Sequence, residues 1–117
     1  MKVKIYGLGW VGKAMQTLFP QAMIQDPSLG LFAPEKADVA FVCVPTPSKD
    51  DWSLDTSIVE EVVKNAEEPL IVIRSTVNPG DCDRWIEKYK KRIVFQAEFL
   101  GETPNHPLID ETQRKFL

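Results

Sequence analysis

The sequence is poor in the residues that build metal centres and disulfide frameworks. Among its 117 residues there is one histidine, His106, and there are two cysteines, Cys43 and Cys82. This inventory argues against a disulfide scaffold and against a histidine-rich or cysteine-rich metal site. Two free thiols fit a reducing, cytoplasmic setting. We expect both cysteines to pack within the core, and we expect no bound metal.

Long apolar runs and an excess of positive charge are also missing. The longest apolar stretch, around residues 39–44, is far too short to span a bilayer. The first residues do not form a secretory signal, because Gly7 and Gly9 interrupt them at once. The formal net charge of −3 argues against nucleic acid or an anionic membrane as the main partner. The composition therefore predicts a cytoplasmic α/β domain.

What the sequence does contain is a regular alternation of strand-like and helix-like segments. The expected strands are 2–6, 22–25, 37–44, 70–73 and 93–95, and the expected helices are 11–18, 57–66 and 81–89. The segment 37–44 is almost continuously apolar, as is typical of a central parallel strand that is covered on both faces. The alternation predicts one domain over residues 1–117, with a Rossmann-like, doubly wound, mainly parallel five-stranded sheet and helices on both faces.

Local patterns add detail to two of these helices. Ser57 and Glu60 have the spacing of a capping box at the start of the second helix. Apolar periodicity predicts the residues that face the core. In the second helix these are Ile58, Val59, Val62, Val63 and Ala66, and in the third they are Cys82, Trp85, Ile86 and Tyr89.

A glycine-rich turn, G-L-G-W-V-G at residues 7–12, follows the first expected strand and precedes the first expected helix. In a dinucleotide-binding βαβ unit, Gly7 permits the tight turn, Gly9 lets the backbone approach a pyrophosphate, and Gly12 allows close packing of helix and strand. The free N–H groups at the start of the helix then bind the phosphates. We expect Trp10 to cover the pyrophosphate, to contact a partner surface, or simply to be an exposed aromatic residue.

An acidic residue stands where such a site needs one. Asp26 comes 19 positions after Gly7, at the end of the second expected strand. A carboxylate there accepts hydrogen bonds from the adenosine ribose and repels a 2′-phosphate, which favours NAD over NADP. The glycine turn, Trp10, Val11 and Asp26 are therefore the candidate cofactor-binding residues. The alternative interpretation is a glycine-rich turn with an unrelated surface aspartate.

Five segments together resemble the N-terminal NAD-binding domain of the UDP-glucose/GDP-mannose dehydrogenase family. They are 5–12 (IYGLGWVG), 42–47 (VCVPTP), 53–60 (SLDTSIVE), 73–80 (IRSTVNPG) and 97–102 (AEFLGE). Their order and spacing agree with the family from residue 39 onward. The resemblance covers nearly the whole chain.

That family oxidises the C6 alcohol of a nucleotide sugar to a carboxylate with two NAD⁺, through a thioester on a cysteine. By position, the resemblance places Thr46 and Thr76 near the nicotinamide, with Thr46 also near the catalytic water. It places Glu98 and Glu102 where sugar and nicotinamide meet. The resemblance thus implies Thr46, Glu98 and Glu102 as catalytic residues. It adds the following cofactor contacts: Val44, Pro45, Thr46, Ser75 and Thr76.

From the residues alone, other interpretations of these positions remain open. Glu98 and Glu102 can equally be interpreted as two solvated surface carboxylates at i, i+4 spacing, and Thr46 and Thr76 as ordinary turn residues. The sequence departs from the family as well. Residues 27–36 replace a longer excursion, which implies a trimmed sheet edge and a shallower adenine pocket. Gly101 and Thr103 stand where the family has arginine and glycine, so the substrate-side loop is altered.

The resemblance also implies that part of the family's machinery lies beyond residue 117. The catalytic cysteine, lysine and aspartate of the family belong to a central helix and a C-terminal domain. We therefore expect a truncated NAD-binding domain that is inactive alone and binds a nucleotide sugar only when another domain completes it. Two alternatives are a non-catalytic NAD-binding or association module, which would allow a homo-oligomer, and one half of a two-polypeptide dehydrogenase.

Overall fold

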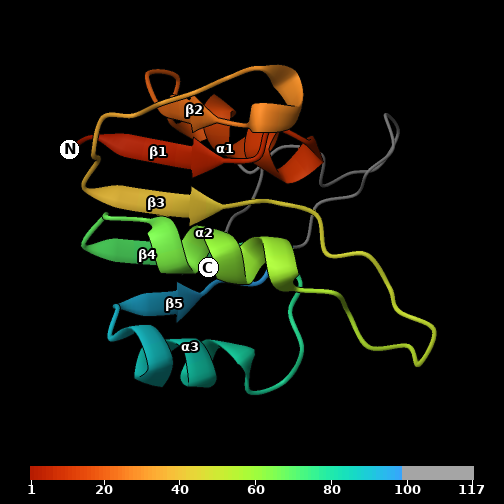
Figure 1. Cartoon of the computed structure of the whole chain (residues 1–117). Coiled ribbons are helices and arrows are strands. Elements are labelled where there is room, and N and C mark those ends of the chain that lie inside the picture. The colour runs from red at the N-terminus through yellow and green to blue at the C-terminus, as the bar shows by residue number, and fades with distance from the viewer. Residues whose placement is uncertain (99–117) are drawn as a thin grey trace.

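The computed structural model describes residues 1–98, in which strands and helices alternate along the chain (Figure 1). The elements are β1 (Val3–Tyr6), α1 (Trp10–Leu18), β2 (Met23–Gln25), a short 3-10 helix η1 (Pro27–Leu29), β3 (Val39–Val42), α2 (Ser57–Asn65), β4 (Leu70–Ile73), α3 (Asp81–Tyr89) and β5 (Ile93–Phe95). The expected order of strands and helices is confirmed. Their ends shift by one or two residues in most cases.

The five strands form one parallel sheet in the order β2-β1-β3-β4-β5. All carboxyl ends therefore lie along one edge, at the right of Figure 1. The winding reverses at β1, because the chain goes from β1 to β2 on one side and then crosses back to β3 on the other. In such sheets ligands bind outside the carboxyl ends at the point of reversal. The expected doubly wound, Rossmann-like fold is confirmed.

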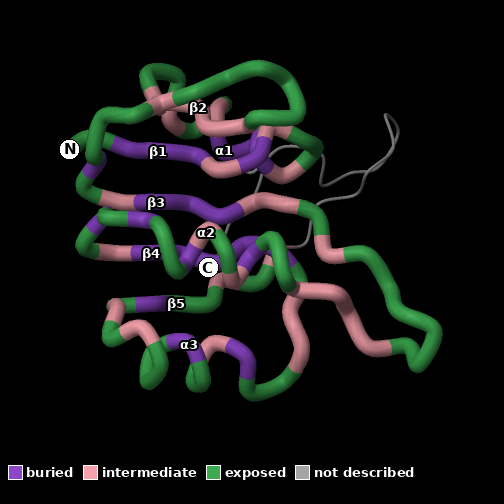
Figure 2. The backbone as a smooth tube through the Cα atoms, in the orientation of Figure 1, coloured by how far each residue is buried: buried purple, intermediate pink, exposed green. Residues whose placement is uncertain are grey.

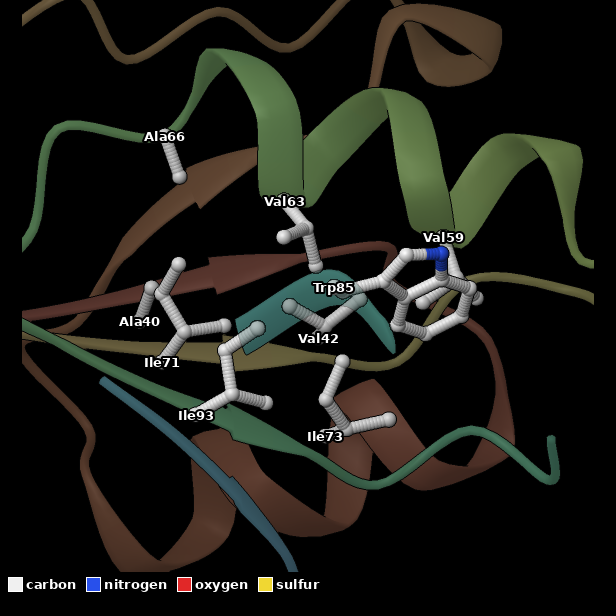
Figure 3. Close-up of a cluster of buried hydrophobic side chains, with 9 residues drawn as sticks. All are labelled: Ala40, Val42, Val59, Val63, Ala66, Ile71, Ile73, Trp85 and Ile93. Atoms are coloured by element: carbon white, nitrogen blue, oxygen red, sulfur yellow. The ribbon is translucent and has the colours of Figure 1, made fainter. Parts of the chain in front are cut away.

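Each face of the sheet has its own apolar layer. On the face covered by α2 and α3, the buried cluster combines residues of β3, β4 and β5 with residues of both helices (Figure 3). On the opposite face, α1 covers β1 and β3 through Met15, which packs against Ile5, Phe41 and their neighbours. Figure 2 shows that burial is concentrated in the central strands, whereas the connection between β2 and β3 is largely exposed.

The carboxyl end of α2 is fixed by a side chain from a distant part of the chain. The Lys91 ammonium donates to the carbonyl oxygens of Val63, Lys64 and Ala66 at 2.6, 2.7 and 2.7 Å. These carbonyls have no partner within the helix, and a cation there also interacts favourably with the helix dipole. This contact ties the end of α2 to the turn before β5.

Two local predictions about the helices are wrong. The capping box of Ser57 and Glu60 does not form, because Asp55 Oδ1 accepts the Ser57 N–H at 3.0 Å, and Glu60 Oε1 instead accepts from the Trp85 indole at 3.2 Å. Ile86 is 39% exposed rather than buried against the core. The capping box is thus replaced by a local bond to Asp55 and by a tertiary bond from Trp85 of α3.

The expected third strand is shorter than its apolar run. β3 ends at Val42 instead of Val44. Beyond it, the Val44 carbonyl accepts from the Ser75 hydroxyl at 2.6 Å, and Pro45 has no N–H to continue the ladder. Within residues 1–98, no helix is long and apolar enough to cross a membrane.

Candidate functional site

A cleft of about 1080 Å³ opens at the carboxyl edge of the sheet, which is a size suited to a cofactor. It is lined by the ends of β1, β2, β3 and β4 and by one side of α2. The sequence-predicted residues on its wall are Gly7, Gly9, Trp10, Val11, Asp26, Val44, Pro45, Thr46, Ser75, Thr76 and Glu98. Gly12 is buried behind this wall. Glu102 lies outside the described residues.

The turn at residues 7–12 requires glycine at two positions for steric reasons. Gly7 has φ +92°, and a Cβ there would lie 2.7 Å from the Cys43 carbonyl oxygen. A Cβ on Gly12 would lie only 2.0 Å from the Gly7 carbonyl oxygen. The Gly7 N–H also donates to the Gln25 carbonyl at 3.0 Å, which extends the β1–β2 pairing into the turn. The turn is thus compact and fixed to both neighbouring strands.

The start of α1 presents a cradle for an anion. Gly9 is the N-cap residue, and no side chain among the described residues caps this end of the helix. A Cβ built on Gly9 would have no described heavy atom within 4 Å, so glycine leaves open space on the cleft side of the turn. The first turn of this nine-residue helix carries no acidic residue. Its N–H groups and helix dipole therefore suit a pyrophosphate.

Asp26 joins the end of β2 to the glycine turn. Its Oδ2 accepts the Leu8 N–H at 2.8 Å, and its Oδ1 accepts from Ser28 through the backbone N–H at 3.1 Å and the hydroxyl at 2.5 Å. The Ser28 hydroxyl, and after it the Leu8 N–H, lower the pKa of the Asp26 carboxyl below its ordinary value. The carboxylate is therefore ionised at neutral pH. It can accept hydrogen bonds from a ribose and repel a phosphate.

The ends of β3 and β4 bring Thr46, Ser75 and Thr76 to the same cleft. Ser75 is buried, and its hydroxyl donates to the Val44 carbonyl at 2.6 Å. Its hydroxyl therefore holds the two strand ends together at the wall of the cleft. Thr46 is half-buried and Thr76 is exposed, so these two hydroxyls are the ones that can meet a ligand. Glu98 lies on the same wall.

Helix α2 contributes an apolar wall that the sequence pattern assigned to the core. Ile58 is 41% exposed, and together with Val62 it lines the cleft. Trp10, 49% exposed, lines the cleft from the start of α1. An apolar wall with a few polar groups is typical of small-molecule sites. Periodicity could not distinguish a residue that faces the core from one that faces a cleft beside it.

A buried polar cluster beneath the cleft was also missed. Glu68 accepts from the Tyr6 hydroxyl at 2.9 Å and from the Ala37 N–H at 3.0 Å, and its Oε2 lies 3.5 Å from the Lys4 ammonium. Burial, and after it the hydrogen bond to Glu68, raises the pKa of Tyr6 above its ordinary value. The cleft extends over β1 to these residues, along the connection 27–36.

Both cysteines are partly buried, as expected. Cys43 packs against the cluster that contains Phe41, and Cys82 packs against the one that contains Trp85. Burial, followed by the charges of Asp81 and Asp83, raises the pKa of the Cys82 thiol and makes it a poor nucleophile. In the part of the chain that the structure describes, no group of three or more His, Cys, Asp and Glu residues is placed to hold a metal ion.

The fold and the glycine cradle together define a dinucleotide-binding domain of the Rossmann class. Residues 31–104 match the UDP-glucose/GDP-mannose dehydrogenase family, NAD binding domain. The chain belongs to this family, and NAD is the cofactor of the matched domain. The match begins after the glycine turn, so the geometry of the turn is an independent indication of dinucleotide binding.

Individual relatives agree with this assignment. Over 78 residues the chain is 36% identical to the UDP-glucose 6-dehydrogenase of Rickettsia conorii, with 58% of this chain and 18% of that protein covered. A ternary complex of GDP-mannose dehydrogenase from Pseudomonas aeruginosa has a similar fold, with a TM-score of 0.65 at 22% identity over 87% of this chain and 37% of that one. For a UDP-glucose dehydrogenase from Pyrobaculum islandicum the TM-score is 0.60 at 21% identity, over 86% and 36%. The chain thus spans 18% of the length of its curated relative.

Proposed function

We propose that this chain is the cofactor-binding part of a nucleotide-sugar oxidoreductase that uses NAD. The observation that supports this most directly is the cradle at Gly9, where open space meets the uncapped start of α1. In this arrangement Asp26 binds the adenosine ribose and the first turn of α1 binds the pyrophosphate. The nicotinamide end then reaches Thr46 and Thr76.

When bound, NAD⁺ supplies the hydride acceptor. The residues of this chain orient the reacting groups around it. We propose that the Thr46 hydroxyl positions a water molecule at the end of β3, and that Glu98 and Glu102 act on the substrate side of the nicotinamide. A carboxylate positioned there can act as a general base.

We further propose that the nucleophilic cysteine of this chemistry comes from another domain or another polypeptide. Cys43 and Cys82 are both packed against core clusters, and the pKa of Cys82 is raised. A hydrolysable thioester needs an accessible thiolate. On this proposal the domain binds NAD alone but oxidises a nucleotide sugar only when the remaining parts are present.

Titration with NADH tests the cofactor proposal. Trp10 lines the cleft and should transfer excitation to bound NADH, so its fluorescence should be quenched, and a Trp52→Phe background removes the emission of an indole that is 90% exposed. NADPH should bind at least about tenfold more weakly, because its 2′-phosphate would face Asp26. If millimolar NADH produces no quenching and no calorimetric heat, the proposal is refuted.

A second role, association, is favoured by exposed apolar side chains in the connection between β2 and β3. Leu29 is 57% exposed and Phe32 is 70% exposed. Exposed apolar groups that lie close together often mark contact surfaces. Sedimentation of the wild type and of Phe32→Ser would test this role, and a strictly monomeric wild type would exclude it.

A further inference from the structure

We propose that Ser28 sets the affinity of the site for the adenosine ribose, because its hydroxyl occupies a position on Asp26 that a ribose hydroxyl must take. The proposal rests on the proposed function, in which Asp26 is the ribose-binding carboxylate. Ser28 follows Asp26 by two residues, is exposed, and lines the cleft. It would act as a built-in competitor for the ligand.

The acceptor capacity of Asp26 explains why the competition arises. A carboxylate offers about four lone-pair positions. Three of them are already used by the Leu8 N–H, the Ser28 N–H and the Ser28 hydroxyl, at 2.8, 3.1 and 2.5 Å. A ribose that binds through two adjacent hydroxyls needs two positions. One of the three protein donors must therefore leave.

The Ser28 hydroxyl is the donor that can leave most easily. The two backbone donors are fixed, because Leu8 belongs to the glycine turn and Ser28 N lies in η1, whose first residue follows the Asp26 cap. The backbone of Asp26 is itself paired with Leu31 through bonds of 2.9 and 3.0 Å. The hydroxyl, in contrast, can rotate about the Cα–Cβ bond and turn to water. The ribose then replaces one hydroxyl by another, with little net gain.

Removal of the Ser28 hydroxyl should consequently tighten binding. In Ser28→Ala the ribose meets an acceptor that has no competing side-chain donor. We expect the Kd for NADH to fall about threefold to tenfold, since hydrogen bonds to charged groups are strong but this carboxylate is open to water. Ser28→Thr keeps a hydroxyl at the same position and should bind as the wild type does.

The chain offers a matched control outside the cleft. Asp51 Oδ1 accepts from the Ser53 N–H at 3.1 Å and from the Ser53 hydroxyl at 2.6 Å, which is the same local arrangement. Neither residue lines the cleft. Ser53→Ala therefore removes an equivalent loop contact, and NADH binding should not change. Thermal melting of both alanine variants shows whether they fold alike.

A second measurement separates ribose recognition from a change in loop structure. ADP and 2′-deoxy-ADP differ in one ribose hydroxyl, so the Kd of 2′-deoxy-ADP divided by the Kd of ADP reports that contact. The ratio should increase about threefold or more in Ser28→Ala relative to the wild type. A purely structural role for Ser28 would change both Kd values by the same factor and leave the ratio unchanged.

The possible results separate this inference from the proposed function. If the wild type does not bind NADH, the proposed function fails and this inference fails with it. If the wild type binds but Ser28→Ala binds equally or more weakly, the Ser28 inference alone is overturned. Tighter binding by Ser28→Ala, an increased ratio of the Kd of 2′-deoxy-ADP to the Kd of ADP, and unchanged binding by Ser53→Ala would together support it.

Discussion

Gly9 and Gly12 lie three residues apart in the same turn, yet substitution by alanine should affect different properties at the two positions, stability at Gly12 and cofactor affinity at Gly9. A Cβ on Gly12 would lie 2.0 Å from the Gly7 carbonyl oxygen and 2.9 Å from its carbonyl carbon. Both atoms belong to the backbone, so no side chain can rotate to relieve the contact. Gly12→Ala must therefore push the start of α1 away from the turn.

The magnitude follows from the size of that displacement. A carbon and an oxygen that are not bonded need about 3.2 Å, so the helix must move by roughly 1 Å in a closely packed region. We expect a loss of about 3 kcal/mol, at the upper end of the range for overpacking. A chain of this length is stable by about 6–18 kcal/mol. With a urea slope of about 1.5–2 kcal/mol per molar, the unfolding midpoint should fall by about 1.5–2 M.

Gly9→Ala is the matched control. Its Cβ would have no described atom within 4 Å, so the fold should tolerate it and the urea midpoint should stay within about 0.5 M of the wild type. The methyl group would, however, occupy the space through which a pyrophosphate approaches the turn. We expect the Kd for NADH to rise at least about tenfold.

The two variants are compared by urea unfolding, followed by far-ultraviolet circular dichroism, and by NADH titration of the folded proteins. The reasoning predicts that Gly12→Ala loses stability and Gly9→Ala loses affinity. A Gly12→Ala protein as stable as the wild type would show that the helix does not pack on the turn as described. Wild-type affinity in Gly9→Ala would show that the cofactor does not cross the turn at this residue.

Three further predictions concern stability. Because the pKa of Tyr6 is raised in the folded state, the unfolded state loses this proton first, and stability should fall above about pH 10. The fall should be at most about 1.4 kcal/mol per pH unit, and less because the side chain is only half-buried. Urea unfolding from pH 9 to 11.5 should show a weaker dependence of stability on pH in Tyr6→Phe than in the wild type, whereas an identical dependence in both proteins would contradict this reasoning. Lys91→Met removes the cation from the end of α2 and should cost about 1–2 kcal/mol in the same assay, so an unchanged midpoint would contradict the capping role. Trp52 has φ +68°, a backbone conformation that is strained for any residue except glycine, and its side chain is 90% exposed. Trp52→Gly should therefore stabilise the fold by about 0.5–1 kcal/mol, whereas Trp52→Ala should not. Equal melting temperatures of the two variants would argue against backbone strain at this position.

Most of the fold could be predicted because its determinants are local. Apolar runs defined the strands, and Pro20 and Asn78-Pro79-Gly80 marked breaks between elements. The errors occurred where a distant residue decides the outcome. Glu60 has the spacing of a capping residue, but the indole of Trp85, 25 positions later, takes its carboxylate. The apolar run that includes Cys43 continues past β3, but Ser75 of the next connection takes the Val44 carbonyl.

The candidate site divides in the same way. The glycine turn and Asp26 could be found because motif and spacing carry the chemistry directly. Ile58 was assigned to the core, since an apolar residue on a helix has the same period whether it faces the sheet or a cleft. The cluster around Glu68 left no sequence signal, because its partners Tyr6 and Lys4 are more than 60 positions away. Ser28 was not singled out from the sequence, although a D-x-S spacing recurs at residues 26–28, 51–53 and 55–57.

The rim of the cleft is preorganised by bonds between strand ends. Gly7 N bonds to Gln25 O at 3.0 Å across β1 and β2, and Ser75 bonds to the Val44 carbonyl at 2.6 Å across the ends of β3 and β4. Ordering these segments therefore costs little when a ligand binds, because the folded domain has already ordered them. Ser28 differs from Ser75 in being exposed at the rim, so its hydroxyl can exchange partners. Tuning of affinity by a rotatable hydroxyl is consequently possible at Ser28, whereas loss of the Ser75 hydroxyl would remove one of the bonds that join the ends of β3 and β4.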